Sequence, residues 1–475
     1  MSYEMKREEH IMSTEAYIGT LIQTARAAQR TIENATQEEV LRIAAAIGWY
    51  VTQNAKKWAE LDLNETGMGV LESKIARNQN KPRHLMRDLK KARTVGIIEE
   101  DKQTGLIKIA KPVGVIGVLA PTTVGIGVTF ICVMNSIMGR NATIISPHPR
   151  AQRTTFAFVG ALRDLLERLG YDPDLLQCIE QPRLEKTNEL MRQCDLIVAT
   201  GGTLMVKAAY SSGTPAYGVG AGNVVSVIDE TADFMQAAEK IRRSQLNDLA
   251  IGCSTENSVV IQKSAYQPMM DAFKQCGAYV LTPEEKQKLQ GTLWIDGHLN
   301  TEVICTPASN IAKVSGFTVP DGTDFLLVEE TGCGKDFPFS WEKLSVVVTV
   351  YQYDRFEEAI ELTNGIQSYS GAGHSCGIHS QNEDHILAFA MQTKTSRVGI
   401  NCSQNTFNAG NWNSPMPATI TLGCGTWGGN ITTENVHWKH YINVTWVGRE
   451  IPNATQPTDE SLFGDVMQDS RVLGE

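Results

Sequence analysis

The hydrophobic pattern of the chain changes near residue 111, from helical spacing to an alternation of strand and helix signals. From residue 14 to about 60, apolar residues recur every three or four positions, which predicts amphipathic helices. VGVIGVL at 113–119 is then a continuous apolar run, as in a strand buried within a parallel sheet. Helical segments and further short apolar runs follow in turn. This order predicts a doubly wound α/β sheet, with ligands at the carboxyl ends of its strands.

The alternation runs through two blocks of the chain, and the second block begins near Val224. The first block predicts strands at 113–119, 142–146, 175–179 and 195–200, and helices at 128–138, 154–170 and 183–193. The second block predicts strands at 224–228, 257–261 and 344–353, and helices at 234–246, 265–277 and 354–364. Residues 440–451 alternate in polarity and predict a β ribbon, which needs a partner sheet in its own or another subunit. We therefore expect two α/β domains of similar size with a cleft between them, in an oligomer.

Composition limits the class of protein. A chain of 475 residues is too long for one hydrophobic core, and its 42% hydrophobic and 20% charged residues are ordinary for a globular enzyme. The net charge of -10 and the lack of a basic run argue against nucleic acid as a partner. No apolar stretch reaches the length of a membrane span, and the charged start lacks a secretion signal. We expect no membrane association and a cytoplasmic location.

Ten cysteines are scattered along the chain, and one of them has unusual neighbours. No two lie at C-x-x-C spacing, so we expect neither a zinc nor an iron–sulfur site and no metal. Most should be reduced thiols that pack in the interior. Cys253, however, stands between Gly252 and Ser254, just before the apolar run SVVI. Such neighbours favour a thiol on a turn near solvent, and Cys253 is therefore a candidate reactive group.

Three turns after predicted strands carry glycine or proline and could approach a nucleotide. They are Pro147–His148 after ATIIS, Thr200–Gly202 after DLIVAT, and YGVGAGN at 217–223. Peptide N–H groups at such turns point toward an anion when a helix follows. None of the three is a G-x-G-x-x-G fingerprint, so a purely structural role stays open for each.

The motifs, taken in order, resemble those of one enzyme family. KPVGVIGVLAP, SPHP, TGG, YGVGAGN, IGCSTENSVVI, GAGHSCGIHS and LGCGTWGGN occur in this order in the CoA-acylating aldehyde dehydrogenases. That family includes enzymes that act on acetaldehyde, succinate semialdehyde and sulfoacetaldehyde. The resemblance extends from about residue 15 to about 450. It implies a Rossmann-like cofactor domain at 1–228, a catalytic domain at 229–430, and a return to the cofactor domain with an oligomerisation ribbon at 431–475, in a homodimer or homotetramer.

The resemblance also implies roles for individual residues. Cys253 corresponds to the nucleophile, which would carry the acyl group after hydride transfer to NAD or NADP, with coenzyme A as co-substrate. The residues that would contact the nicotinamide cofactor are Pro147, His148, Thr200, Gly201, Gly202, Gly220 and Glu342. His374 could steer the acyl group or coenzyme A, or only pack in the core. Arg397 could pair with an anionic substrate, although a salt bridge is the common role of an arginine. Arg150 beside His148 hints at a cofactor with a 2′-phosphate.

One position decides between the subclasses of the family. Hydrolytic relatives carry a glutamate five residues before the asparagine that corresponds to Asn223, and this chain has Gly218 there. Thiolysis by coenzyme A is therefore expected rather than hydrolysis. Hydrolysis needs a base to activate water, whereas a thiol is already a good nucleophile and has less need of one. Glu256 could substitute as the base, but a carboxylate at this place is more often a capping residue. The hydrolytic dehydrogenase remains the alternative.

A second position departs from the family. Relatives usually have an asparagine where this chain has Val124, and that side chain helps to stabilise the oxyanion. Loss of one such donor costs about 2.7–4 kcal/mol in the transition state. The backbone N–H of Cys253 could replace it, or the protein could be an inactive scaffold. For the aldehyde itself, the order of preference is sulfoacetaldehyde, succinate semialdehyde and acetaldehyde.

Overall fold

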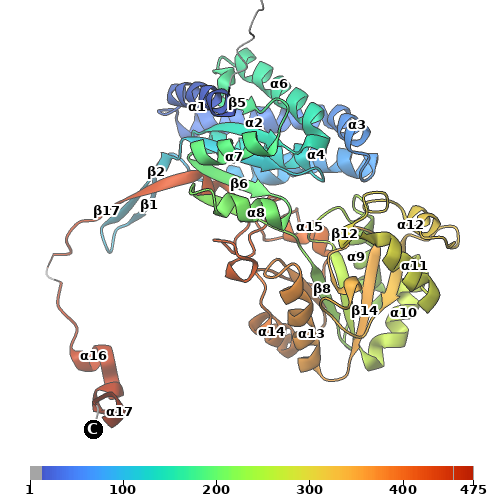
Figure 1. Ribbon diagram of the computed structural model, residues 1–475. Coiled ribbons are helices and arrows are strands. Elements are labelled where there is room, and N and C mark those ends of the chain that lie inside the picture. Colours follow the sequence, from blue (N-terminus) through green and yellow to red (C-terminus); the bar gives the residue numbers. More distant parts are fainter. Residues whose placement is uncertain (1–12, 453, 474–475) are drawn as a thin grey trace, which may run out of the picture.

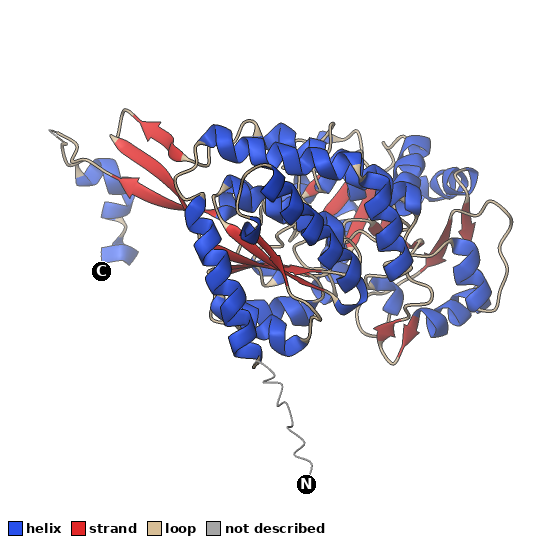
Figure 2. Ribbon diagram, turned by 90° about the horizontal axis from the view of Figure 1, so that it is seen from above, coloured by secondary structure: helices blue, strands red, loops and turns tan. Residues whose placement is uncertain are grey.

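The computed structural model describes residues 13–452 and 454–473. Two lobes, each built around a parallel sheet, lie one above the other in Figure 1, and an antiparallel ribbon extends away from the first lobe. Figure 2 shows the same ribbon from above, with helices packed on both faces of the sheets. Within the described residues, no helix is long and apolar enough to cross a membrane.

The first lobe contains the strands of the first predicted block, in the order β5-β4-β3-β6-β7. Its strands are β3 (Val115–Ala120), β4 (Ala142–Pro147), β5 (Leu176–Cys178), β6 (Leu196–Thr200) and β7 (Ala216–Val219). Its helices are α1 (Thr14–Thr31), α2 (Gln37–Gln53), α3 (Ala55–Thr66), α4 (Leu71–Leu89), α5 (Gly125–Met138), α6 (Gln152–Arg168), α7 (Leu184–Gln193) and α8 (Thr203–Tyr210). Strands β3 and β4 and the whole of α5 are buried, which explains their continuous apolar sequence.

The second lobe is built on a parallel sheet with the order β10-β13-β14-β9-β8-β15-β16. Its strands are β8 (Val224–Ile228), β9 (Glu256–Gln262), β10 (Ala278–Val280), β13 (Phe325–Glu329), β14 (Val347–Tyr353), β15 (Cys376–His379) and β16 (Val398–Ile400). Its helices are α9 (Phe234–Leu246), α10 (Tyr266–Gln275), α11 (Pro283–Leu293), α12 (Ala308–Val314), α13 (Phe356–Tyr369), α14 (Glu383–Gln392) and α15 (Gln404–Asn408). A small hairpin pairs β11 (Trp294–Ile295) with β12 (His298–Leu299). The core of this lobe lies between the sheet and these helices.

The ribbon combines two segments that are far apart in sequence. Strand β2 (Leu106–Pro112) pairs antiparallel with β1 (Gly96–Asp101) on one side and with β17 (Ile442–Val447) on the other. The predicted ribbon at the end of the chain thus finds a partner sheet in its own subunit. Beyond it, α16 (Asp459–Phe463) and α17 (Ser470–Leu473) lie apart from both lobes in Figure 1.

The crossing between the lobes differs from the predicted boundary at residue 228. Strand β8 pairs with β9 and β15 of the second sheet, not with the first sheet. The chain therefore first passes from the first lobe to the second at residues 220–223, between β7 and β8. Hydrogen bonding between strands decides this point, and a single apolar strand does not show in its own sequence which sheet it joins.

Candidate active site

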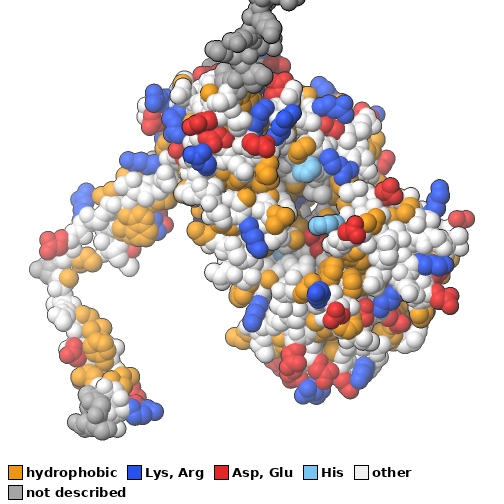
Figure 3. Space-filling view, viewed as in Figure 1, with side chains coloured by type: hydrophobic (Ala, Val, Ile, Leu, Met, Phe, Trp, Pro, Cys, Tyr) orange, Lys and Arg blue, Asp and Glu red, His pale blue; other side chains and the backbone are white. Residues whose placement is uncertain are grey.

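A cavity of about 1170 Å³ lies between the two lobes and is lined by residues of both. Figure 3 shows a hollow at this place, with histidine side chains near it. The cavity brings together the predicted nucleophile and all of the predicted cofactor residues: Pro147, His148, Thr200, Gly201, Gly202, Gly220, Cys253 and Glu342. Val124 also lines it, at the residue before α5, where its side chain offers no hydrogen-bond donor.

The topology of the first sheet explains why these turns meet. Parallel strands β3, β4 and β6 are neighbours, and each ends where a cavity-lining turn begins. Pro147 is the last residue of β4, and Thr200 is the last residue of β6. Ligand sites of open α/β sheets lie at this carboxyl edge. The cavity therefore lies at the carboxyl edge of the sheet, where the sequence predicted ligands to bind.

Cys253 lies on the turn between α9 and β9, and the residues just before it in this turn have a strained backbone. Asp248, Leu249 and Ala250 have φ angles of 56°, 54° and 60°. Three successive non-glycine residues in the left-handed region are costly, at about 1–3 kcal/mol each. Such a conformation persists only where surrounding contacts impose it.

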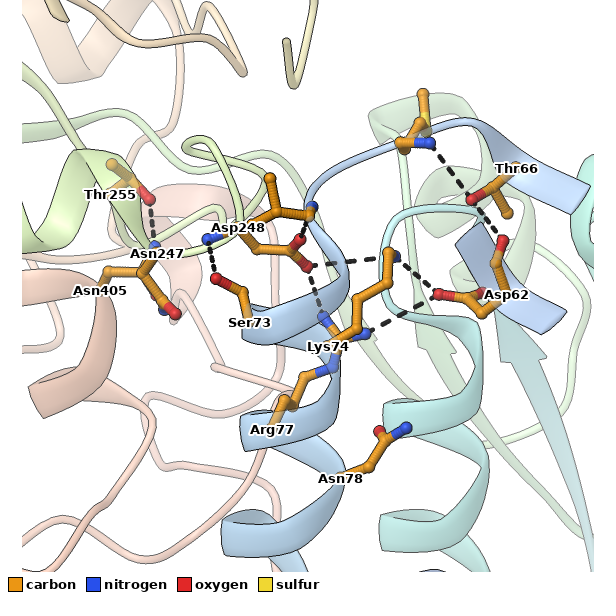
Figure 4. Close-up of polar contacts among 12 residues, drawn as sticks. Asp62, Thr66, Ser73, Lys74, Arg77, Asn78, Asn247, Asp248, Thr255 and Asn405 are labelled. Atoms are coloured by element: carbon orange, nitrogen blue, oxygen red, sulfur yellow. Dashed lines mark hydrogen bonds and ion pairs between the residues drawn. The ribbon is translucent and has the colours of Figure 1, made fainter. Parts of the chain in front are cut away.

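Helix α4 and the residue before it supply those contacts (Figure 4). The carboxylate of Asp248 accepts hydrogen bonds from the backbone N–H of Val70 and from Arg77 Nη1, both at 2.8 Å. The backbone N–H of Asp248 donates to Ser73 Oγ at 3.0 Å. The turn that leads to Cys253 is thus fastened to the first lobe.

A buried ion pair supports the same helix from the other side. Lys74 Nζ lies 2.6 Å from Asp62 Oδ2, and the side chains of both residues are almost fully buried. Lys74 Nζ is also 4.0 Å from the carboxylate of Asp248. The pair therefore joins α3 to α4 and adds positive charge behind the Asp248 carboxylate.

The thiol of Cys253 contacts a histidine from the second lobe. Cys253 Sγ is 3.1 Å from His374 Nε2, and His374 Nδ1 is 2.8 Å from Ser375 Oγ. Gly222 packs so closely on the turn that a Cβ there would overlap the carbonyl oxygen of Cys253. The N–H of Gly222 donates to Glu342 Oε1 at 3.1 Å, so Glu342 also faces this turn.

Burial sets the protonation of these groups. Burial, with the Glu342 carboxylate adding to it, raises the pKa of the Cys253 thiol to about 12. Burial also raises the pKa of Glu342 to about 8, and it lowers the pKa of His374 to about 3. At neutral pH the site therefore holds a neutral thiol beside a neutral imidazole. This pair can move a proton from sulfur to nitrogen when the sulfur forms a bond.

Arg397 does not line the cavity, which corrects its predicted role as a substrate cation. Its guanidinium donates to the carbonyl oxygens of His374 at 2.7 Å, Gly423 at 2.6 Å and Thr433 at 3.1 Å, and to Asn435 Oδ1 at 3.2 Å. With only 4% of its surface exposed, it holds the segment that carries His374 in place. The sequence TSRVGIN does not reveal such burial.

Two further side chains lie away from the cavity. Glu256 is buried and accepts from the backbone N–H of Gln404 at 3.1 Å, so it holds the start of α15 and is no substitute base. Arg150 donates to the carbonyl oxygen of Thr66 at 3.4 Å and is absent from the cavity lining within the described residues. Its suggested contact with a 2′-phosphate gains no support.

Sequence reasoning missed one wall of the cavity. Arg77, Lys81 and His84 of α4 line it, together with Trp412 on the facing loop. The spacing of the three basic residues, i, i+4 and i+7, places them on one helix face and was available as a signal. Their position on a cavity wall could not be predicted from the sequence, because it depends on contacts between residues more than 300 positions apart.

The sequence of residues 8–291 matches the profile of the aldehyde dehydrogenase family. A sulfoacetaldehyde dehydrogenase from Acholeplasma sp is 43% identical over 459 residues, which cover 95% of this chain and 94% of that protein. The chain belongs to the aldehyde dehydrogenase family. A succinate-semialdehyde dehydrogenase (acetylating) from Clostridium kluyveri is 37% identical and is covered over its full length, with 95% of this chain. The crystal structure of an acetylating aldehyde dehydrogenase from Geobacillus thermoglucosidasius matches with a TM-score of 0.89 at 34% identity, over 94% of this chain and 98% of that one.

These comparisons confirm the predicted aldehyde dehydrogenase fold and the resemblance to the CoA-acylating branch. The protein is an oxidoreductase of this family. The predicted cofactors, a nicotinamide nucleotide with coenzyme A as co-substrate, agree with solved structures of this fold, of which one holds propionyl-CoA and another NADP+.

Proposed function

We propose that the protein oxidises a small aldehyde, sulfoacetaldehyde first among the candidates, to its acyl-CoA thioester through a covalent intermediate on Cys253. The observation that carries this proposal is the contact of 3.1 Å between Sγ of Cys253, which lines the interlobe cavity, and Nε2 of His374, which is buried directly behind it. A nucleophile paired with a proton acceptor is the arrangement that covalent catalysis requires.

The turns of the first sheet have room for a nicotinamide nucleotide. Gly202 and Gly220 line the cavity, and a Cβ built on either would meet no atom within 4 Å. Gly202 is also the N-cap of α8, whose first N–H groups can receive a phosphate. When bound, the cofactor supplies the hydride acceptor. Thr200, Gly201 and Glu342 would hold it on the same side of the cavity.

The chain's own residues then perform the acyl transfer. As Cys253 Sγ bonds to the aldehyde carbon, His374 Nε2 takes the thiol proton. Val124 offers no donor for the developing oxyanion, and in this proposal the backbone N–H of Cys253 takes that role. Loss of hydride from the adduct leaves a thioester on Cys253. The acyl group then passes to the sulfur of coenzyme A, and Cys253 regains its proton.

Packing at Gly218 favours thiolysis over hydrolysis. A Cβ at this position would lie 2.8 Å from Val206 Cγ1 and 2.9 Å from Tyr210 Cε2. Tyr210 Oη also bonds to both the N–H and the carbonyl oxygen of Gly218. There is no room for the carboxylate that would activate water. The thioester is therefore expected to react with the thiol of coenzyme A, which is a stronger nucleophile than water.

Relatives support the order of substrates. Besides the relative from Acholeplasma sp, a sulfoacetaldehyde dehydrogenase (acylating) from Bilophila wadsworthia is 41% identical over 94% of this chain. Both exceed the 37% identity of the succinate-semialdehyde enzyme. Sulfoacetaldehyde therefore stands first, followed by succinate semialdehyde and acetaldehyde.

The test is the dependence of turnover on coenzyme A. Purified protein with each aldehyde, NAD or NADP, and coenzyme A should give reduced cofactor and acyl-CoA in equal amounts. Turnover at an undiminished rate without coenzyme A would instead favour the hydrolytic alternative. If none of the three aldehydes yields reduced cofactor and Cys253 takes up no label from them, the protein is a scaffold and the proposal is wrong.

A further inference from the structure

Helix α4 presents one stripe of its surface to the cavity, and the ionisable side chains of this stripe are all basic. Its residues in the cavity wall lie at helical spacing: Ser73, Ala76, Arg77, Asn80, Lys81 and His84. The carboxylates of the same helix, Glu72 and Asp88, lie off the stripe. A wall of one charge sign attracts a ligand of the opposite sign.

The basic groups of this stripe keep hydrogen-bond donors unused. Lys81 Nζ donates to the carbonyl oxygens of Ala409 at 2.7 Å and Gly410 at 3.4 Å, which leaves one of its three N–H groups. In the described structure, neither ring nitrogen of His84 has a hydrogen-bond partner, although the side chain is only 6% exposed. Arg77 Nε is likewise buried and unpaired there. Unsatisfied buried donors are costly unless a ligand completes them.

Like charges crowd one another at this wall. Burial, with help from Arg77 and Arg87, lowers the pKa of Lys81 to about 7. Burial and the neighbouring Lys81 lower the pKa of His84 to about 4. The nearby Asp88 is engaged by Arg87 at 2.7 Å and by the backbone N–H of Ala418 at 2.7 Å. Arg77 is paired with Asp248 at 2.8 Å, but the described residues offer Lys81 and His84 no free carboxylate, and an anion would supply that charge.

The facing loop closes the pocket beside these groups. Trp412 packs edge-on against the His84 ring, with centroids 4.5 Å apart. Arg87 Nη1 donates to the carbonyl oxygen of Asn411 at 2.6 Å, and together with Lys81 it fastens this loop to α4. The side chain of Trp412 remains 62% exposed, so it forms the outer side of the pocket next to His84.

We infer that Lys81 and His84, beside the Asp248-paired Arg77, form an anion subsite that binds the sulfonate or carboxylate of the aldehyde substrate while its carbonyl group faces Cys253. The inference rests on the proposed function and replaces Arg397, whose donors are occupied elsewhere. The phosphates of coenzyme A share the same chemistry, so the experiment must separate the two sources of the anion.

Two substitutions test the subsite. His84→Phe keeps the aromatic contact with Trp412 and removes both ring nitrogens, and Lys81→Met keeps the aliphatic stem and removes the charge. For each variant, kcat/KM is measured for sulfoacetaldehyde and for uncharged acetaldehyde, and KM is measured for coenzyme A. The ratio of the two kcat/KM values should fall about tenfold or more, the cost of a lost charge-assisted hydrogen bond. Lys81→Arg should keep most of the ratio, and Arg83→Met, on the exposed face of α4, should not change it.

The outcomes separate the inference from the proposed function. An unchanged ratio overturns the subsite, and so does a rise in the KM of coenzyme A with both aldehydes, which would assign the anion to coenzyme A. A wild-type protein that oxidises no aldehyde with coenzyme A overturns the proposed function itself. If a variant does not fold, 2-hydroxyethanesulfonate serves as the probe. It should inhibit acetaldehyde oxidation by the wild type competitively and at lower concentration than ethanol, and equal inhibition by the two would contradict the inference.

Discussion

In the proposed mechanism Cys253 and His374 form the reacting pair, and their side chains are in contact although 121 residues separate them in sequence. The imidazole is buried and neutral, and Ser375 holds its other nitrogen. A pKa lowered to about 3 means that His374 does not compete for protons from solvent at neutral pH. The low pKa makes it a weak base in the free enzyme, so in the proposed mechanism it takes the thiol proton only as the sulfur bonds to the aldehyde carbon, because that bond makes the proton more acidic.

The raised pKa of Cys253 predicts how the free enzyme reacts with an alkylating agent. Because the pKa is about 12, only a small fraction is thiolate at neutral pH. The rate of alkylation by iodoacetamide should rise about tenfold per pH unit between pH 6 and 9, since the thiolate is the nucleophile. Mass spectrometry of the peptide that contains Cys253 gives this rate. A plateau below pH 8 would show that the site lowers the pKa instead.

Replacement of His374 tests its part in the chemistry. His374→Ala should lower kcat by about 100-fold or more, the usual contribution of a general base. Ser375→Ala, which removes only the contact to Nδ1, should have a smaller effect. Partial rescue of the His374→Ala variant by added imidazole would support proton transfer over a packing role. Wild-type kcat in the His374→Ala variant would exclude the proposed role.

Motif order was sufficient to predict Cys253 and the turns around it, because each motif is local. The pairing with His374 and the true role of Arg397 were not predictable. Both depend on how β15 and its neighbours bring distant segments together. Burial changed Arg397 from a candidate ligand to a support for the His374 segment.

At the scale of elements, the link between α9 and β9 determines where the nucleophile stands. Its left-handed residues store strain, and Asp248 holds them through α4. Asp248→Ala would leave Arg77 buried without its partner and should destabilise the protein by about 3–5 kcal/mol. It should also slow alkylation of Cys253. Asp248→Asn, which tolerates the left-handed region, should be milder in both respects.

Denaturant unfolding and the alkylation rate check this pair of variants together. Equal stability and reactivity of Asp248→Ala and the wild type would show that the turn keeps its shape without the anchor. A loss of stability without any change in alkylation rate would confine the role of Asp248 to folding.

Most strands of the first sheet were predicted, because buried parallel strands read as short apolar runs. In the second sheet β8, β9 and β14 were predicted, and β10, β13, β15 and β16 were not. Strands β1 and β2 were not predicted. They lie in the ribbon, where most of their residues are exposed or half-buried, and so they lack an apolar signature. The assignment of β8 to the second sheet also required the structure, because the sequence of one strand does not show which strands it pairs with.

At the scale of the whole molecule, the ribbon extends away from the two lobes, and most side chains of β17 are exposed. Strand β17 pairs with β2 along one edge, and its side chains include Trp446, which is 64% exposed. Edge strands of this kind pair with another chain or need protection. We predict a dimer or tetramer in solution, formed through the ribbon.

Light scattering with size-exclusion chromatography checks this prediction. Thr445→Pro, within β17, should shift the mass toward the monomer, because proline removes a backbone donor and bends the strand. Substitution of the exposed Trp49 of α2 by Ser offers a control on another surface. A wild-type monomer would contradict the prediction.

The acyl group on Cys253 is the central claim, and it can be measured directly. The enzyme is mixed with sulfoacetaldehyde and NAD or NADP without coenzyme A, quenched in acid, digested and analysed by mass spectrometry. The account predicts the added acyl mass on the peptide that contains Cys253, its disappearance when coenzyme A is added before the quench, and its absence in Cys253→Ser. An unmodified Cys253 in an enzyme that still forms acyl-CoA, or an acyl group on another cysteine, would contradict the account.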